Sequence, residues 1–339
     1  MSINKNFIIY LFLSIAFLFA SSYIFDDYGM RILNNIFIFI VLAASYNLIN
    51  GVTGQFSLEP NGFVAIGAYI TAICLLSEDL KLDLYQLEDP APWVLALNTS
   101  LVPALLLSGV VASFVAVCLA APVFRVRGDY LAIVTLGFGF IIKVIAINQP
   151  EITNGSIGLN EIPSLINVYW TGGIAIITVI VMLNIVHSKF GRAMKAIRDD
   201  EDAASAIGIN TFKIKTMAFG TSAFFEGIGG GLLAILLTTI SPDLFTFFLT
   251  FQLLIIIVLG GLGSMTGAII GTILVIGGSE WLRFLDSSMN IFGYETDAHP
   301  GLRMVVFSII LILVMLFARE GIMGKKELSD VFKRKRKWY

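Results

Sequence analysis

YWTGGIAIITVIVMLNIVH, residues 169–187, is followed directly by SKFGRAMKAIRDDEDAASAIGINTFKIKT, residues 188–216. The first segment is apolar and long enough for a membrane-spanning helix, which needs about 20 such residues. The second segment holds six of the chain's 22 Lys and Arg residues. An apolar run that ends in a basic loop is typical of a membrane span with its flanking loop.

The charged loop, residues 188–216, is predicted to form two short helices. The first covers residues 190–198 and ends in basic residues, and the second opens with the acidic cluster 199–202 and stops near Gly208. Carboxylates suit the start of a helix, cations suit its end, and Gly is favoured just past the end. Charge alone leaves two interpretations open, a loop solvated on all sides and a docking site for a partner.

The composition of the whole chain is that of a membrane protein. Of its 339 residues 57% are apolar and 14% are charged, and the mean hydropathy is +0.87, whereas soluble domains have about 25% charged residues. Apolar runs recur along the whole length, and each predicts a membrane-spanning helix. We therefore predict an all-α, polytopic integral membrane protein with no sizeable soluble domain. Cys74 and Cys118 lie in apolar runs, and His187 and His299 are far apart, so no metal site is expected.

About ten membrane spans are predicted. The run 244–278 is too long for one span and too short for two with a loop, so we expect two shortened helices that meet at a glycine break. The spans form a transmembrane domain, residues 1–324, which includes the loop 188–216, and a basic tail follows over residues 325–339. The spans are predicted within residues 7–25, 31–50, 51–76, 97–124, 130–148, 169–187, 217–239, 244–260, 267–278 and 301–318.

The distribution of positive charge orients these spans. With ten crossings and an inside N-terminus, 17 of the 22 Lys and Arg residues fall on the inner side, and only Arg31, Lys81, Arg283 and Arg303 fall on the outer side. This satisfies the positive-inside rule only if the break near Gly260 separates two crossings. Both termini are therefore predicted to be cytoplasmic. The basic tail is expected to contact anionic membrane lipid, and the alternative is a specific regulatory partner.

Two glycine-rich segments break the predicted spans. GVTGQFSLEPNG runs from Gly51 to Gly62, and GGLGSMTG runs from Gly260 to Gly267. Neither can be a lipid-exposed helix, because lipid offers no partners for the freed backbone groups. Transporters place such breaks near the membrane midplane, where they bind solutes. The candidate pathway residues in the two breaks are Gln55, Ser57, Glu59, Asn61, Gly260, Gly261, Gly263 and Ser264.

Two ionisable side chains, Lys143 and Glu226, lie inside predicted spans. A charge at the bilayer centre costs at least about 2.5 kcal/mol, so such residues usually face a pathway or one another. We include both in the candidate pathway. In the alternative interpretation they lie near helix ends and extend to the surface. The G-x-x-x-G spacing from Gly227 to Gly231 is interpreted as close helix packing.

Motifs for catalysis are absent from the sequence. No G-x-x-x-x-G-K-[ST] occurs, so the chain is not expected to bind ATP itself. No H-E-x-x-H, G-x-S-x-G or paired C-x-x-C occurs either. We predict a protein that is not an enzyme and has no bound cofactor, no metal and no nucleic-acid partner.

A series of motifs in a fixed order carries a family resemblance. They are NLINGVTGQFSL with GFVAIGAY, RVRGDYLAIVTLGFG, NGSIGL, FGRAMKAIRDDEDAASAIGIN, VLGGLGSMTGAIIG and PGLRMVVFSIILILVMLF. Over residues 43–325 the chain resembles the permease subunits of branched-chain amino acid ABC importers, and it resembles the M-type more closely than the H-type.

The resemblance implies an α-helical permease of the bacterial inner membrane. Its partners would be an H-type permease, two ABC ATPase subunits that use ATP and Mg²⁺, and a periplasmic solute-binding protein. The solute would be leucine, isoleucine, valine or a related small solute, and related permeases carry urea, short amides or sugars. The loop resembles the coupling segment that docks into the ATPase. The matching residues are Gly191, Arg192, Ala196, Ile197, Arg198, Asp202, Ala203, Ala204 and Gly208.

Three departures from the family pattern fall in the candidate pathway. Residues 59–61 are EPN where the family usually has Gly, then His or Gln, then Ala. Phe140 stands at a usual Glu position, and Glu226 stands in a segment that is normally small and apolar. We hypothesise that Glu226 replaces the missing acid and pairs with Lys143. Two rival functions are an ion-coupled secondary transporter, which usually needs an acidic relay inside the spans, and a membrane enzyme, which needs clustered catalytic residues.

Overall fold

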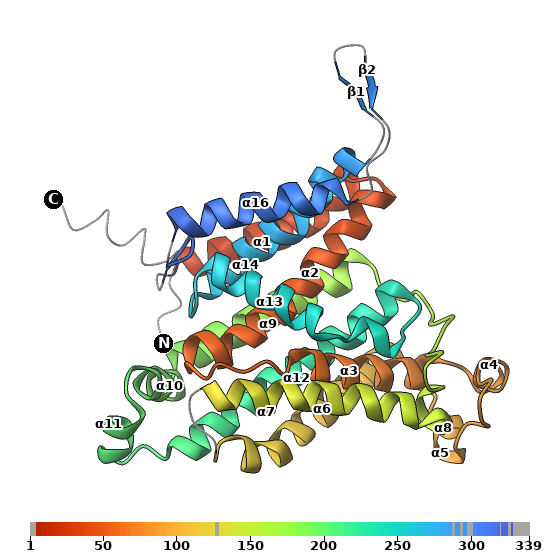
Figure 1. Ribbon diagram of the computed structural model, residues 1–339, viewed down its shortest axis with the longest axis horizontal. Helices are drawn as coiled ribbons and strands as arrows, with labels where there is room; N and C mark the ends of the chain where they lie inside the picture. Colours follow the sequence, from red (N-terminus) through yellow and green to blue (C-terminus); the bar gives the residue numbers. More distant parts are fainter. Residues whose placement is uncertain are drawn as a thin grey trace.

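The computed structural model describes residues 5–125, 129–286, 289–291, 294–296, 301–318, 320–324 and 327. Within these residues the chain is almost entirely helical (Figure 1). Apart from Glu327, the predicted basic tail, residues 325–339, lies outside the described residues. The α-helices are α1 (Lys5–Ile24), α2 (Asp27–Asn47), α3 (Pro60–Leu75), α4 (Glu78–Leu84), α5 (Pro92–Ala96), α6 (Leu101–Val123), α7 (Asp129–Asn148), α8 (Pro150–Thr153), α9 (Val168–His187), α10 (Lys189–Asp199), α11 (Glu201–Ala206), α12 (Thr211–Leu237), α13 (Phe247–Gly260), α14 (Met265–Thr272), α15 (Gly278–Trp281) and α16 (Leu302–Phe317). The short π- and 3-10-helical segments are η1 (Leu48–Val52), η2 (Pro242–Leu244), η3 (Ile273–Gly277) and η4 (Leu282–Asp286).

Several helices are suited to cross a membrane. Six helical segments are long and apolar enough to be candidate spans, and α3 with α4, which bend by 118° at their junction, could form a seventh. The remaining predicted spans correspond to shorter apolar helices, Phe12–Ile24, Met265–Trp281 and Val305–Val314. The predicted helical, multi-span architecture is therefore confirmed for the described residues, with six candidate spans of full length where ten spans were predicted. These six are Asp27–Val52, Leu101–Val123, Tyr130–Asn148, Val168–His187, Thr211–Leu237 and Pro242–Gly260.

One short hairpin departs from the helical architecture. β1 (Met289–Ile291) and β2 (Tyr294–Thr296) pair antiparallel between η4 and α16. The sequence predicts no strand here, only the connection between the spans 267–278 and 301–318. Ile, Tyr and Thr favour strands. The two strands have three residues each, so they form no long apolar run that would mark them in the sequence.

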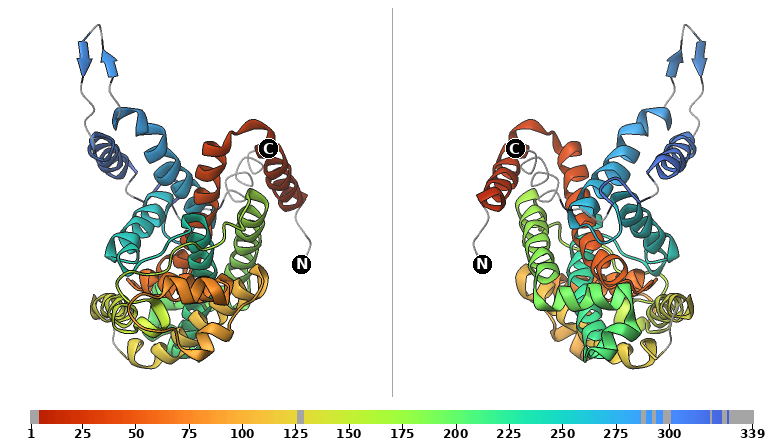
Figure 2. Two further views of the ribbon diagram at one scale, coloured as in Figure 1. Left: turned by 90° about the vertical axis from the view of Figure 1, so that its right-hand side faces the viewer. Right: turned by 90° about the vertical axis from the view of Figure 1, so that its left-hand side faces the viewer.

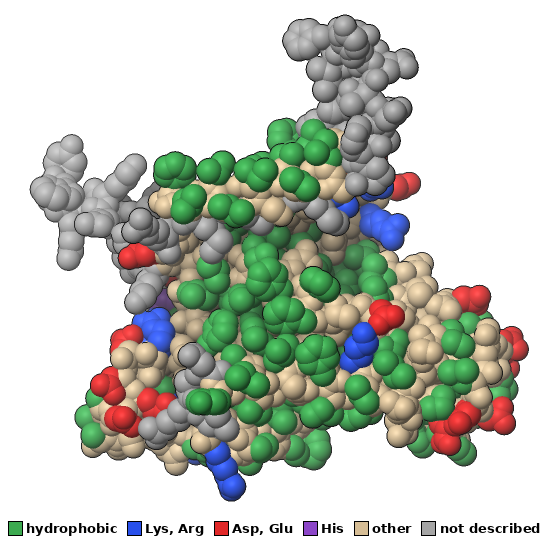
Figure 3. Space-filling model, in the orientation of Figure 1, with side chains coloured by type: hydrophobic (Ala, Val, Ile, Leu, Met, Phe, Trp, Pro, Cys, Tyr) green, Lys and Arg blue, Asp and Glu red, His purple; other side chains and the backbone are tan. Residues whose placement is uncertain are grey.

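The helices run lengthwise between two ends of the bundle (Figure 1). One end, here called the α10 end, carries α10 and α11, and the opposite end, the α4 end, carries α4, α5 and α8. Figure 2 looks along the bundle and shows α1 and α16 on opposite flanks with α2 between them. Figure 3 shows apolar side chains over the middle of one face, while acidic side chains gather toward the two ends. This distribution suits a bundle whose middle faces lipid.

The core forms where α3, α6 and α12 approach one another at glycines. A Cβ atom on Gly67 of α3 would lie 2.0 Å from the carbonyl oxygen of Gly227 in α12. A Cβ on Gly227 would lie 2.7 Å from the carbonyl oxygen of Ser108 in α6, and one on Gly231 would lie 2.3 Å from Thr71 Oγ1. The packing interpretation of the spacing from Gly227 to Gly231 is thus confirmed, because missing side chains bring the helices to backbone distance.

Lys81 fastens the α4 end. It is fully buried, and its Nζ donates hydrogen bonds to the carbonyl oxygens of Val94 and Leu97 at 2.7 and 2.5 Å. Burial lowers the pKa of the Lys81 ammonium. The sequence analysis counted Lys81 only as an outer-side cation, whereas the structure uses it to hold the α5 segment against α4.

Candidate functional site

The loop 188–216 folds into the two short helices that its sequence predicts. Ser188 precedes α10, and its Oγ accepts hydrogen bonds from two amides of the first turn. Asp200 precedes α11, and its carboxylate accepts a hydrogen bond from the amide of Ala203 at 2.9 Å. Both residues are N-caps of a favoured type. Gly208 follows α11 with a φ of +88°, which favours glycine.

The exposed surface of α10 and α11 only partly matches the predicted docking residues. Sequence reasoning missed Phe190 and Ile207, which are 46% and 77% exposed. Large apolar side chains that face solvent are a stronger docking signal than mixed charges. The docking role itself stays a prediction. Among the predicted residues, Arg192, Asp202, Ala203 and Gly208 are exposed, Ala196 and Arg198 are half-buried, and Gly191, Ile197 and Ala204 are buried within the chain.

Arg198 joins α10 to the first glycine break. Its Nη1 donates a hydrogen bond to the carbonyl oxygen of Gly51 at 3.4 Å, and its guanidinium pairs with Asp199 at 3.1 Å. A Cβ on Gly54 would lie 2.4 Å from Arg198 Cγ. Arg198 therefore connects the loop to the spans.

The second glycine break lies at the α10 end, whereas the sequence analysis expected it near the middle of the bundle. Gly261 and Gly263, with φ of +119° and +87°, turn the chain from α13 into α14. The amide of Gly263 donates to Asn47 Oδ1 at 3.0 Å, and Asn47 Nδ2 donates to the carbonyl oxygen of Ser264 at 2.9 Å. α13 already reaches the α10 end before it stops at Gly260, so the break is a tight helix connection whose backbone groups the protein itself satisfies.

The first break passes through the interior. After η1 a non-helical segment, residues 53–59, leads to the start of α3. Asn50 accepts a hydrogen bond from the amide of Ser57 at 3.0 Å and donates to its carbonyl oxygen at 3.2 Å. Tyr46 Oη donates to the same carbonyl at 2.7 Å. The predicted pathway residues of this segment are Gln55, which is half-buried, and Ser57, Glu59 and Asn61, which are buried.

Asn61 ties the start of α3 to the start of α13. Its amide donates to Thr250 Oγ1 at 3.2 Å, and Thr250 Oγ1 donates to Asn61 Oδ1 at 3.1 Å. Asn61 Nδ2 donates to the carbonyl oxygen of Phe245 at 3.2 Å, just before α13. The N-terminal ends of two helices therefore meet in the interior. This is the arrangement in which broken helices present backbone groups to a solute.

Glu59 and Glu226 lie in the same buried region. Both are fully buried, and they lie close enough to each other and to Tyr46 for electrostatic coupling. Ser222 Oγ lies 2.9 Å from Glu226 Oε1 and 2.7 Å from the carbonyl oxygen of Ser45. Among the described residues, both Glu59 carboxylate oxygens and Glu226 Oε2 have no hydrogen-bond partner. Buried carboxylates without partners are costly, which makes this pair the strongest polar feature of the candidate pathway.

Lys143 does not pair with Glu226, so the pairing hypothesis is wrong. Lys143 Nζ contacts Asp243 Oδ1 at 2.7 Å, where the side chain of Asp243 is 84% exposed. The long stem of Lys143 lets its ammonium reach this surface partner, while Glu226 projects from α12 toward Ser222 inside the bundle. The surface interpretation therefore holds for Lys143 and fails for Glu226. Phe140, on the same helix as Lys143, is 52% exposed.

We expect Lys143→Gln to change the free energy of unfolding by less than about 1 kcal/mol, because exposed ion pairs contribute little. Thermal unfolding of the purified chain in detergent would measure this effect. Asp243→Asn is the matched variant and should behave in the same way. A large loss of solute uptake in both variants would contradict a surface role for the pair.

Glu226→Gln is expected to raise the free energy of unfolding by about 1 kcal/mol and to lower solute uptake at least about tenfold. The amide keeps a hydrogen-bond acceptor for Ser222 but removes a buried ionisable group, so stability rises while the pathway loses its carboxyl group. Thermal unfolding and uptake in proteoliposomes would measure the two effects. Glu59→Gln should change both quantities in the same directions. Lower stability together with unaltered uptake would argue for a purely structural role.

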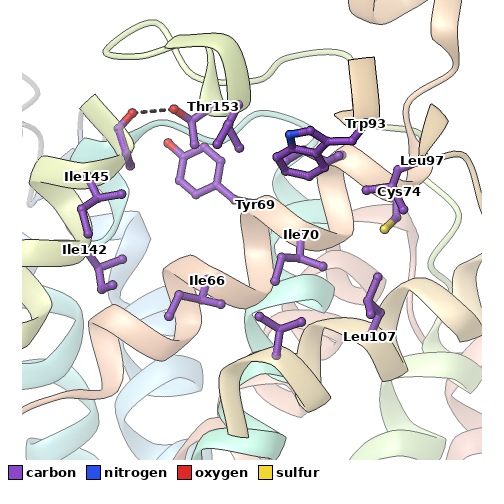
Figure 4. Close-up of a pocket in the computed structure, with 14 residues that line it drawn as sticks. Ile66, Tyr69, Ile70, Cys74, Trp93, Leu97, Leu107, Ile142, Ile145 and Thr153 are labelled. Carbon is purple, nitrogen blue, oxygen red and sulfur yellow. Dashed lines mark hydrogen bonds between the residues drawn. The ribbon is translucent and has the colours of Figure 1, made fainter. Parts of the chain in front are cut away.

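An apolar cavity of about 380 Å³ lies between α3, α6 and α7 (Figure 4). No charged side chain is among the residues that line it. Thr153 Oγ1, at its rim, donates a hydrogen bond to the carbonyl oxygen of Ala146 at 2.5 Å. The cavity suits aliphatic groups and offers no partner for a solute's charges. Figure 4 labels Ile66, Tyr69, Ile70, Cys74, Trp93, Leu97, Leu107, Ile142, Ile145 and Thr153 around it.

Comparisons with known proteins agree on one family. A family model described as branched-chain amino acid transport system / permease component matches residues 29–315. The high-affinity branched-chain amino acid transport system permease protein LivM of Salmonella typhimurium and that of Escherichia coli are each 33% identical over 291 residues. These matches cover 76% of this chain and 64% of each relative, so the chain spans less than two thirds of their length.

Another permease of the same transport system is less similar but matches more of the chain. The LivH permease protein of Escherichia coli is 26% identical over 312 residues, which cover 86% of this chain and 93% of the relative. No solved structure gives a significant match.

Proposed function

The chain belongs to the family of branched-chain amino acid permease components, and from this premise we propose that it is a permease subunit of a binding-protein-dependent ABC importer. Its solute would be leucine, isoleucine, valine or a related small solute. The family model and the LivM and LivH relatives support this proposal. Urea, short amides and sugars are the alternative solutes for this fold of permease.

We further propose ten crossings, with the α10 end in the cytoplasm of a bacterial cell and the α4 end outside its inner membrane. The crossings would be α1, α2, α3, α6, α7, α9, α12, α13, α14 with α15, and α16. Hydrogen bonds at both ends of the spans support this arrangement. Tyr28 in the first turn of α2 donates to Glu280 of α15 at 2.9 Å, so the start of α2 and the end of α15 lie together. The amide of Ile322, which follows α16, donates to the carbonyl oxygen of Leu259 in α13 at 2.9 Å, beside the α10 end. Both termini would then be cytoplasmic, in agreement with the distribution of basic residues.

In this proposal, partner subunits supply the energy and the solute. The chain has no P-loop, so two ABC ATPase subunits would hydrolyse ATP with Mg²⁺, a second, H-type permease would complete the channel, and a periplasmic binding protein would deliver the solute. α10 and α11 would dock on an ATPase through Phe190 and Ile207. The single observation that carries the proposal is that Arg198 of α10 contacts the first glycine break at Gly51, because this joins a solvent-facing loop to the interior of the spans.

The proposed pathway runs along the first break. Asn61 and Thr250 would hold the two helix starts together, and the carboxylates of Glu59 and Glu226 would interact with positive charge on the solute. Closure of the paired ATPases would move α10, and Arg198 would pass this movement to the non-helical segment 53–59. In this proposal the chain's own residues bind and orient the solute and transmit the movement of α10, while the ATPase subunits hydrolyse ATP.

The proposal is tested by purification from the native membrane followed by reconstitution. We expect an ATPase to co-purify, and we expect radiolabelled leucine to enter proteoliposomes only when ATP and binding protein are both present. ATP-dependent uptake of urea or sugar without leucine uptake would correct the solute alone. Uptake driven by an ion gradient without ATP would establish the rival secondary transporter, which the buried pair of Glu59 and Glu226 favours more than a single carboxylate would.

A further inference from the structure

The segment that follows α16 returns to the second glycine break. The amide of Ile322 donates to the carbonyl oxygen of Leu259 at 2.9 Å, and the amide of Met323 donates to that of Gly260 at 3.0 Å. These carbonyls belong to the last turn of α13, where helices leave acceptors without intrahelical partners. The segment therefore covers the end of α13.

Glu327 binds the start of α14. Its carboxylate is buried and accepts hydrogen bonds from the amide of Met265 at 2.7 Å, the amide of Thr266 at 3.1 Å and Thr266 Oγ1 at 2.8 Å. First-turn amides lack intrahelical acceptors, and a carboxylate also suits the positive end of the helix dipole. The sequence analysis placed Glu327 in the basic tail. Residues 322–323 bind the end of α13 and Glu327 binds the start of α14, so together they form a clamp on the turn 261–264.

The clamped turn touches α10 and the first glycine break at one point. A Cβ on Gly51 would lie 2.3 Å from the amide nitrogen of Gly263, and a Cβ on Gly263 would lie 3.3 Å from Arg198 Nη1. Asn47 adds hydrogen bonds to both sides of the turn. Gly51 and Gly263 are in backbone contact, and the Arg198 side chain lies against both, so a movement of α10 toward the spans would press on the turn.

We infer that Glu327 is a positioning residue for energy coupling, which keeps the turn 261–264 rigid so that Arg198 passes movement of α10 to the spans. This inference rests on the proposed function, in which α10 docks on an ATPase. The three hydrogen bonds of Glu327 all go to α14. Its removal should therefore loosen the turn and leave the exposed docking surface of α10 and α11 unchanged.

The test compares transport with ATP hydrolysis in the reconstituted complex. We expect Glu327→Gln to lower the amount of leucine taken up per ATP hydrolysed by about tenfold, because three charge-assisted hydrogen bonds are weakened. The ATPase subunits should co-purify in the wild-type ratio. Thr266→Val removes one of the three hydrogen bonds to Glu327, together with the 3.2 Å contact between Thr266 Oγ1 and Ser264 Oγ, and should lower the same quantity by about two- to threefold. Glu320→Gln, which changes an exposed carboxylate in the same segment, is the matched control and should behave like wild type.

Hydrogen exchange of the purified chain gives a readout that needs no ATPase. Glu327→Gln should speed exchange of the amides of Met265 and Thr266 and leave residues 189–206 as in wild type. Unaltered exchange at these two amides would overturn the clamp, even if the wild-type chain retained no ATPase and the proposed function failed separately. Faster exchange with an unaltered ratio of uptake to hydrolysis would overturn the coupling role. Loss of the ATPase from the purified variant would also overturn it, since the effect would then lie in docking.

Discussion

Gly67→Val is expected to abolish most accumulation of the folded chain in the membrane. A Cβ at this position would lie 2.0 Å from the carbonyl oxygen and 2.6 Å from the Cα of Gly227. Both are backbone atoms that cannot rotate away, so α3 would have to separate from α12. Overpacking costs about 1–3 kcal/mol even where side chains can move, and we expect at least about 3 kcal/mol here. Membrane yield and thermal unfolding in detergent would measure the loss.

Two other glycines provide matched controls for this variant. Gly137 in α7 and Gly173 in α9 also lie in candidate spans, but among the described residues no atom of another element lies within 4 Å of a Cβ built on either. Gly137→Val and Gly173→Val should therefore keep a yield close to wild type. An equal loss in all three variants would mean that Val disturbs the helices themselves, and the argument from close packing would fail.

Ile207→Asp is expected to remove the ATPase subunits from the purified complex and to lower ATP-driven uptake by at least about tenfold. The side chain is 77% exposed at the end of α11, so the change should hardly affect the stability of the chain. A central apolar anchor of an interface typically contributes about 2 kcal/mol or more, and a carboxylate in its place would have to be desolvated. Co-purification and uptake in proteoliposomes would measure the two effects. Phe190→Asp should act in the same direction.

Leu82→Asp is the matched control for the docking variants. Leu82 lies on α4 at the opposite end of the bundle and is 54% exposed, so it tests whether any exposed apolar residue gives the same result. The variant should retain the ATPase. If Ile207→Asp also retained the ATPase and full uptake, the surface formed by Phe190 and Ile207 would have no docking role. Arg198→Glu is less decisive, because Arg198 also contacts Gly51.

Local patterns predicted the helical content and the two loop helices well. The length of an apolar run and the N-caps Ser188 and Asp200 act within a few residues, so they can be read from the chain directly. The exposure of Ile207 could not be predicted in this way. From the sequence, an isoleucine that follows an alanine-rich helix is expected to be buried. In the fold the side chain of Ile207 faces outward at the end of α11.

The membrane class, the helical architecture and the family resemblance were determined by the sequence alone, because apolar run length and motif order are properties of the linear chain. Only the tertiary structure decided that Glu226 lies with Ser222 and Glu59, that Lys143 reaches Asp243, and that the second break stands beside α10. Apart from the contact of Glu226 with Ser222, which lies one turn away on α12, each of these contacts joins different elements of the bundle. They depend on how each helix is rotated about its axis and on where it ends, and a linear pattern does not specify either quantity.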